Sequence, residues 1–130
     1  MGQIVNINSI QHQYQRYNTV GDWQYNKDEF RRDVLTINVS STGDHNYDML
    51  IAIHELIEAV LCKANGITEE LVDLFDKTNE DHTEPGLIPS CPYYREHMVA
   101  SIIERMIADE LGIEWNEYGE ILENVWKSRS

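Results

Sequence analysis

The apolar stretch Met49–Cys62 (MLIAIHELIEAVLC) carries three titratable side chains, His54, Glu55 and Glu58, within five positions. In a helix these three side chains share one arc, with apolar or small residues on both sides of it. A charge in such surroundings needs a partner of opposite charge or a metal ion. His54 and Glu58 are one helical turn apart, so they can hold one ion from the same side, and Glu55 is then placed to act as a general base.

A second helical segment, later in the chain, has a matching polar face. The side chains on this face are His97, Ala100, Ser101, Glu104 and Ala108. Small residues allow another helix to approach closely, so we expect this face to pack against the helix that carries His54. His97 would then join His54 and Glu58 as a third ligand, and Glu104 would be a fourth ligand or would orient His97. Imidazole and carboxylate ligands in this number predict a divalent-metal site, with zinc as the ion.

Each of these residues, taken alone, also fits a purely structural role. A histidine on an apolar helix can be a hydrogen-bonded core residue, and Glu58 can pair with Arg95 or Arg105 in a buried salt bridge. The remaining histidines lie in polar contexts and are expected at the surface: His12, His45 and His82.

The elements that must position these residues can be read from periodicity and from caps. Residues 34–40 (VLTINVS) alternate and predict a half-buried strand. Residues 13–25 (QYQRYNTVGDWQY) indicate two earlier strands, joined by a turn at Gly21-Asp22. Helices are expected at about 45–65, 69–80, 92–111 and 115–127, with Thr68 as a cap and with Gly66 and Gly112 as stops.

Strands followed by helices predict an α+β fold, in which a small N-terminal antiparallel sheet precedes about four helices. A length of 130 residues suits one domain, here 1–130. All three prolines lie in residues 81–92 (DHTEPGLIPSCP), which predicts an irregular and fairly rigid loop between the second and third helices.

The charge balance restricts the class of partner. The chain has 23 acidic and 10 basic residues, for a formal net charge of −13. This excess repels phosphate backbones, so direct binding of nucleic acid is not expected. It fits a protein that uses carboxylates as metal ligands, or an acidic decoy that binds a basic host protein.

Two further absences restrict the setting of the chain. No run approaches the roughly eighteen consecutive apolar residues of a membrane span, and no membrane association is expected. The two cysteines, Cys62 and Cys91, cannot form a disulfide framework, which favours the cytoplasm.

The order of a strand, a loop and a helix bearing His54-Glu55-Leu56-Ile57-Glu58 resembles the core of zincin metallopeptidases. In that family an edge strand precedes a helix with the motif His-Glu-x-x-His, whose histidines bind zinc and whose glutamate is the general base. The resemblance covers roughly residues 34–65 and implies that His54 is a ligand and Glu55 the base. The second histidine of the motif is replaced by Glu58.

A second resemblance is to the MazG-type nucleotide pyrophosphohydrolases, which hold magnesium with Glu-x-x-Glu and Glu-x-x-Asp on two helices. Here Glu55 and Glu58 are followed by Glu70 and Asp73, and Asp73 with Asp76 offers a second register. Carboxylate oxygens suit Mg²⁺, so this resemblance implies a magnesium-dependent hydrolysis of nucleotides. It leaves His54 and His97 without a role.

The chain as a whole resembles small proteins of tailed phages and prophages that share the scheme RYxTVGDW, HELIEAxLC, GI, VDxFD, EPG and PYxxEH. Its parts stand here at Arg16–Trp23, His54–Cys62, Gly66-Ile67, Val72–Asp76, Glu84–Gly86 and Pro92–His97. The resemblance implies a phage protein in the cytoplasm of the infected bacterium, and no particular activity.

The sequence thus predicts a phage-encoded metal-binding protein. If its site is catalytic, the reaction is a zincin-like, metal-dependent hydrolysis of a small-molecule or peptide substrate. The alternatives are a magnesium-dependent nucleotide pyrophosphohydrolase and a non-enzymatic acidic protein that binds a host factor.

Overall fold

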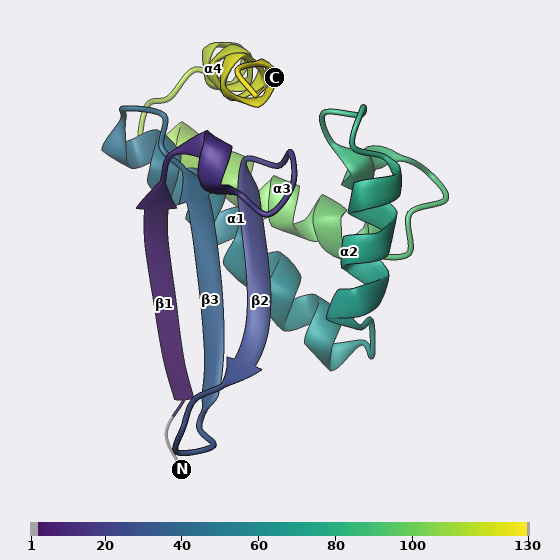
Figure 1. The fold of residues 1–130 in the computed structure, drawn as a ribbon. Helices are drawn as coiled ribbons and strands as arrows, with labels where there is room; N and C mark the ends of the chain where they lie inside the picture. Colours follow the sequence, from purple (N-terminus) through teal and green to yellow (C-terminus); the bar gives the residue numbers. More distant parts are fainter. Residues whose placement is uncertain (1–2, 130) are drawn as a thin grey trace.

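Three strands form a sheet in the first third of the chain and four α-helices follow, which confirms the predicted α+β class (Figure 1). The computed structural model describes residues 3–129. In chain order the elements are β1 (Gln3–Ile10), the 3-10 turn η1 (His12–Tyr14), β2 (Gly21–Lys27), β3 (Asp33–Ser40), α1 (His45–Ala64), α2 (Glu69–Thr78), the 3-10 turn η2 (Pro85–Leu87), α3 (Tyr94–Glu110) and α4 (Trp115–Lys127).

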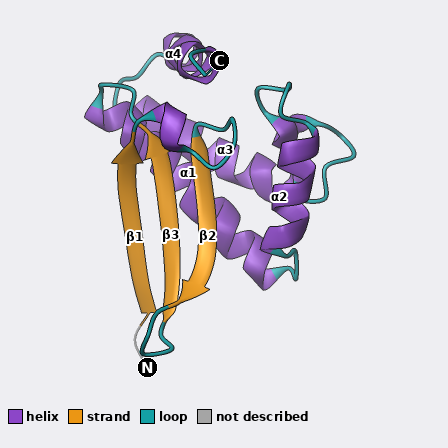
Figure 2. Ribbon diagram, in the orientation of Figure 1, coloured by secondary structure: helices purple, strands orange, loops and turns teal. Residues whose placement is uncertain are grey.

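The sheet has the strand order β1-β3-β2 and is mixed (Figure 2). β2 pairs antiparallel with β3, as predicted, but β1 pairs parallel with β3, so the prediction of a purely antiparallel sheet is wrong. The short segment 28–32 forces β3 to run back along β2. The longer segment 11–20 crosses the end of β3 and places β1 on its other side, pointing the same way as β3. β3 is therefore the central strand, whereas the zincin resemblance implies an edge strand before the helix.

The turn predicted at Gly21-Asp22 is also wrong, because β2 begins at Gly21. The residues before it are drawn away from the sheet by side-chain contacts with α2. Arg16 forms ion pairs with Asp22 and Asp73 at 2.8 and 3.0 Å, and the hydroxyl of Tyr17 donates to Asp76 Oδ2 at 3.1 Å. Segment 15–20 is therefore tied to α2, and it meets β3 at its end, where Ser40 N donates to Val20 O at 2.8 Å.

The alternation predicted for residues 34–40 is confirmed. Leu35, Ile37 and Val39 are buried on the face of β3 that α1 covers. α1 packs mainly against β2 and β3, so β1 residues on the same face stay open: Ile7, the register partner of Ile37, is 46% exposed.

The helix ends follow the predicted local signals. Asp44 caps α1 by accepting from the backbone nitrogens of Asn46 and Tyr47, and the chain turns out of α1 at Gly66, whose φ is 72°. Thr68 caps α2 by accepting from Leu71 N at 3.2 Å.

α1 and α3 pack side by side behind the sheet, as their matching faces predict (Figure 1). Four alanines are buried in this part of the core: Ala52, Ala59, Ala100 and Ala108. α4 lies across the end of the sheet where β1 and β3 finish. None of the helices described in residues 3–129 is both long and apolar enough to cross a membrane.

Replacement of Ile37 by Ala should cost about 2–5 kcal/mol of unfolding free energy, because it leaves a cavity in the layer between β3 and α1. The matched change Ile7→Ala, at its half-exposed register partner, should cost less than about 1 kcal/mol. Urea denaturation of both variants measures the difference. Equal losses would mean that the helices cover β1 as fully as β3.

Candidate metal centre

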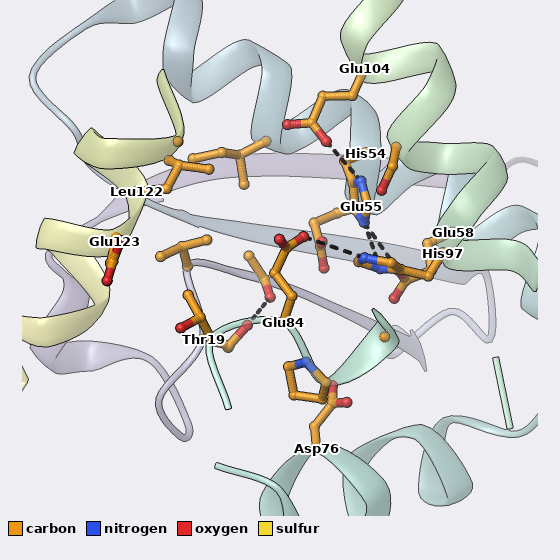
Figure 3. A pocket seen from close by; sticks show the side chains of 18 of the residues that line it. Thr19, His54, Glu55, Glu58, Asp76, Glu84, His97, Glu104, Leu122 and Glu123 are labelled. Carbon is orange, nitrogen blue, oxygen red and sulfur yellow. Dashed lines mark hydrogen bonds and ion pairs between the residues drawn. The ribbon is translucent and has the colours of Figure 1, made fainter. Parts of the chain in front are cut away.

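Three polar atoms from α1 and α3 meet in the interior of the protein. His54 Nε2 lies 3.1 Å from Glu58 Oε2 and 3.2 Å from His97 Nδ1, and His97 Nδ1 lies 3.0 Å from the same Glu58 oxygen. The three residues are only 8%, 5% and 7% exposed for His54, Glu58 and His97 respectively. The predicted neighbourhood of the two imidazoles is confirmed, since their ring centroids are 4.6 Å apart (Figure 3).

This triangle of donors has the size of one face of a tetrahedral metal site. Zinc bonds to nitrogen and oxygen are about 2.0–2.1 Å long, so neighbouring donors around a tetrahedral zinc lie about 3.3 Å apart. Protons can also fill this triangle. Both ring nitrogens then donate to the same oxygen of Glu58, and their two N–H groups face each other. A cation at the centre attracts all three atoms at once.

A carboxylate stands behind the imidazole of His54. Nδ1 of His54 donates to Glu104 Oε1 at 2.9 Å, and the other oxygen of Glu104 accepts from the hydroxyl of Tyr118 at 2.6 Å. This contact sets the tautomer that leaves Nε2 free to be a ligand. The structure thus places Glu104 behind His54, rather than in the ligand triangle or beside His97.

His97 has a corresponding carboxylate in Glu84, which comes from the proline-rich loop. His97 Nε2 lies 3.5 Å from Glu84 Oε1, and this buried nitrogen has no closer hydrogen-bond partner among the described residues. The loop can come this close because residue 86 is a glycine: a Cβ there would lie 2.3 Å from Cγ of His97. Gly86 therefore sets the distance between the loop and the imidazole.

The second oxygen of Glu58 is also occupied. Nε1 of Trp23, on β2, donates to Glu58 Oε1 at 3.2 Å. The salt bridge considered between Glu58 and Arg95 or Arg105 does not form within residues 3–129, where both arginines are exposed and Arg105 lies over the ring of Trp115. Glu58 is thus held by one indole and two imidazoles.

The charges of the triangle are strongly coupled. Burial alone would raise the pKa of Glu58, but the hydrogen bonds from His54 and His97 outweigh it and lower the pKa to about 2. Burial would lower the pKa of His97, but Glu58 and Glu84 raise it to about 9. The pKa of His54 is raised in the same way, against burial, by Glu104 and Glu58. Protons therefore hold the place that a divalent ion would take, and ion binding would release them.

Glu55 lies beside the triangle on the same helix and points into a cleft of about 200 Å³ that the triangle also lines (Figure 3). Burial, followed by the negative charge of Glu58, raises the pKa of Glu55 well above its ordinary value. Its carboxylate has room because residue 21 is a glycine, where a Cβ would lie 2.7 Å from Cγ of Glu55. Glu55 thus lies in the cleft beside the triangle, and its role as a base stays a prediction.

Only some of the carboxylates required by the magnesium alternative line this cleft, namely Glu55 and Glu58 of α1. Glu70 and Asp73 do not line it, and Asp73 is instead paired with Arg16 at 3.0 Å. Of the carboxylates on α2, the one at the cleft is Asp76, whose pKa burial raises to about 7. The geometry favours a site that uses His54 and His97 over an all-carboxylate site.

The expectation for one other histidine is wrong. His12, expected at the surface, is buried, where its ring nitrogens contact Ser40 Oγ and the side-chain amide of Asn18 at 2.8 and 2.7 Å. Cys62 is fully buried but does not belong to the group of possible metal ligands.

Sequence reasoning missed three residues that surround the triangle: Trp23, Glu84 and Tyr118. A sequence signal existed for the first two, because they stand in the GDW and EPG parts of the scheme on which the expected phage resemblance rests. In the structure these parts meet the HELIE and PYxxEH parts at one place, through the contacts of Trp23 with Glu58 and of Glu84 with His97. Tyr118 has no signal beyond its helical spacing in α4.

The close contact of Gly86 with His97 leads to a stability prediction. The replacement Gly86→Ala should cost about 1–3 kcal/mol of unfolding free energy, because the added methyl group must displace the imidazole or the loop. The matched control Gly119→Ala adds its methyl group in open space within α4 and should gain about 0.5–1 kcal/mol. Urea denaturation of the metal-free proteins measures both changes. A Gly86→Ala protein as stable as the wild type would contradict the close packing described here.

The chain was also compared with known proteins. No family model, curated protein or solved structure matches it. The function therefore has to be argued from the geometry of the site.

Proposed function

We propose that this chain binds a zinc ion with His54, Glu58 and His97, and that it is a zincin-like metal-dependent hydrolase of phage origin. One observation carries the proposal: three ligand atoms from two helices face one another within 3.2 Å at the wall of a cleft. The phage origin is supported by the sequence scheme alone.

The number of ligands favours catalysis over a structural role. Structural zinc sites are closed by four protein ligands, whereas catalytic sites use three and keep one position for substrate. The three atoms here leave such a position, and their side chains line the cleft. A zinc ion held there would act as a Lewis acid toward a substrate carbonyl.

The protein's own residues would divide the remaining tasks. Glu104 and Glu84 hold the two imidazoles in the tautomers that present Nε2 of His54 and Nδ1 of His97 to the ion. Trp23 fixes the carboxylate of Glu58. Glu55, which has no hydrogen-bond partner among the described residues, would take the proton from the attacking water and pass it to the leaving group.

The third ligand distinguishes this arrangement from the zincin motif. Glu58 stands where the motif has its second histidine, and His97 supplies the second imidazole from α3 instead. A site of two histidines and one glutamate is an established ligand set for hydrolytic zinc.

Metal-dependent stability is the main test. Zinc should raise the melting temperature of the wild type. At a free zinc concentration of about a hundred times Kd, binding should add about 2.7 kcal/mol to the free energy of unfolding. Glu58→Gln keeps the shape but loses the charge, so its zinc affinity should fall by more than about 100-fold. Thermal melts of untagged protein with zinc, with magnesium and after chelation measure both effects.

A matched control for that variant is Glu96→Gln. Glu96 is as buried as Glu58 but bonds to Asn65, away from the site, so its variant should respond to zinc as the wild type does. Identical wild-type melts in all metal conditions would count against the proposal and favour the acidic decoy. Stabilisation by magnesium alone, with turnover of nucleotides, would favour the pyrophosphohydrolase.

The role of Glu55 as a base can be separated from ligand binding. Glu55→Gln should leave zinc affinity within about threefold of the wild type, yet should slow hydrolysis by about 100- to 10,000-fold. Titration calorimetry with zinc and turnover of a mixed peptide pool measure the two quantities. A variant that loses zinc would make Glu55 a ligand, and one that keeps full turnover would remove it from the mechanism.

A further inference from the structure

We propose that the cleft selects a positively charged substrate, namely a peptide segment that places a lysine or arginine side chain beside the metal centre, and that it rejects anionic substrates. This inference rests on the proposed zinc site. It adds a substrate class, which neither the triangle nor the resemblance to zincins specifies.

All four helices contribute negative charge to the cleft. α1 contributes two carboxylates to its wall, α2, α3 and α4 contribute one each, and the proline-rich loop contributes one more. The lining carboxylates are Glu55, Glu58, Asp76, Glu84, Glu104 and Glu123. Within residues 3–129, no lysine or arginine lines this cleft. One divalent ion balances only two carboxylates, so the ionised carboxylates among the others leave the cleft with a net negative charge.

Some of these carboxylates already form hydrogen bonds or ion pairs, and the others determine the electrostatic field in the cleft. Glu104 is bonded to His54 and Tyr118, and Lys127 pairs with Glu123 from outside the cleft at 3.0 Å. The side chain of Glu84 is 55% exposed. Glu55 points into the cleft, and it has no hydrogen-bond partner among residues 3–129. A cleft with charge of one sign and apolar walls concentrates its field, so it attracts cations and repels phosphates.

The uncharged part of the wall suits the stem of a long basic side chain. Trp115, Tyr93 and Leu122 line the cleft, and an aliphatic stem can lie along such surfaces while its charged end reaches a carboxylate. The ring of Trp115 already accepts a cation on the protein, since Arg105 lies 5.4 Å from its centroid.

The size of the cleft also favours a single amino-acid side chain as its occupant. Its volume is about 200 Å³. That is less than the roughly 300–1,000 Å³ of sites that enclose a small-molecule ligand. It therefore suits one residue of an extended peptide better than a whole nucleotide.

The test uses protein loaded with cobalt, whose visible absorption reports ligand binding at the metal. Three Nα-acetylated hydroxamates serve as probes, because they share the metal-binding group and differ in side-chain charge: those of lysine, norleucine and glutamate. We expect the lysine probe to bind tightest and the glutamate probe weakest, with at least a tenfold difference at low salt. The difference should shrink in about 1 M salt, where screening extends over only about 3 Å.

A pair of variants at Gly119 isolates the charge of the cleft. Gly119 lines the cleft, and a Cβ there meets nothing within 4 Å, so a longer side chain can be added without a clash. Gly119→Lys should reduce or reverse the preference for the lysine probe. Gly119→Gln, of similar length but uncharged, should preserve it.

The outcomes separate the two proposals. Cobalt binding with equal affinities for the three probes, or with tightest binding of the glutamate probe, would overturn the charge selection and leave the metal site intact. Equal probe preferences of the Gly119→Lys and Gly119→Gln proteins would also overturn the charge selection and leave the metal site intact. Absence of cobalt absorption bands would overturn the metal site, and the substrate inference with it.

Discussion

The convergence of His54 Nε2, His97 Nδ1 and Glu58 Oε2 on one buried point is the constraint on which the rest of the site depends. The three atoms lie 3.0–3.2 Å from one another, on side chains that are almost fully buried. Such groups are costly to bury unless a cation or protons lie between them. The surrounding contacts are those that keep the three atoms in place once a cation is there: Trp23 on Glu58, Glu104 on His54 and Glu84 near His97.

The path of the chain through the mixed sheet also positions residues of the site. Because segment 11–20 crosses the end of β3, β2 starts beside α1. Gly21, at the start of β2, leaves room for the side chain of Glu55. Trp23, two residues later, donates to Glu58. The same crossing segment is tied to α2 through Arg16. The strands thus form one side of the site, and α3, α4 and the proline-rich loop form the others.

The local parts of the fold could be predicted from the sequence, and the non-local parts could not. Caps, stops and periodicity predict strand 34–40 and the four helices within a few residues, and the polar faces around His54 and His97 predict that their helices meet. β1 has mostly exposed residues and no alternation of burial, so its parallel pairing depends on chain crossing rather than on its own pattern. Helical wheels give directions around one helix only. They cannot show that Glu84, in an irregular loop, reaches His97, or that Tyr118 orders Glu104.

The central claim is that two imidazoles and one carboxylate hold a zinc ion. X-ray absorption spectroscopy of untagged protein with one equivalent of zinc measures these ligands directly. The proposal predicts a first shell of nitrogen and oxygen at about 2.0–2.1 Å, with the outer-shell scattering of two imidazoles. That imidazole signal should fall to one imidazole or less in the His97→Ala protein, weaken in the Glu58→Gln protein and be kept in the Glu96→Gln protein. A sulfur shell at about 2.3 Å, or a first shell without imidazole scattering, would contradict the proposal.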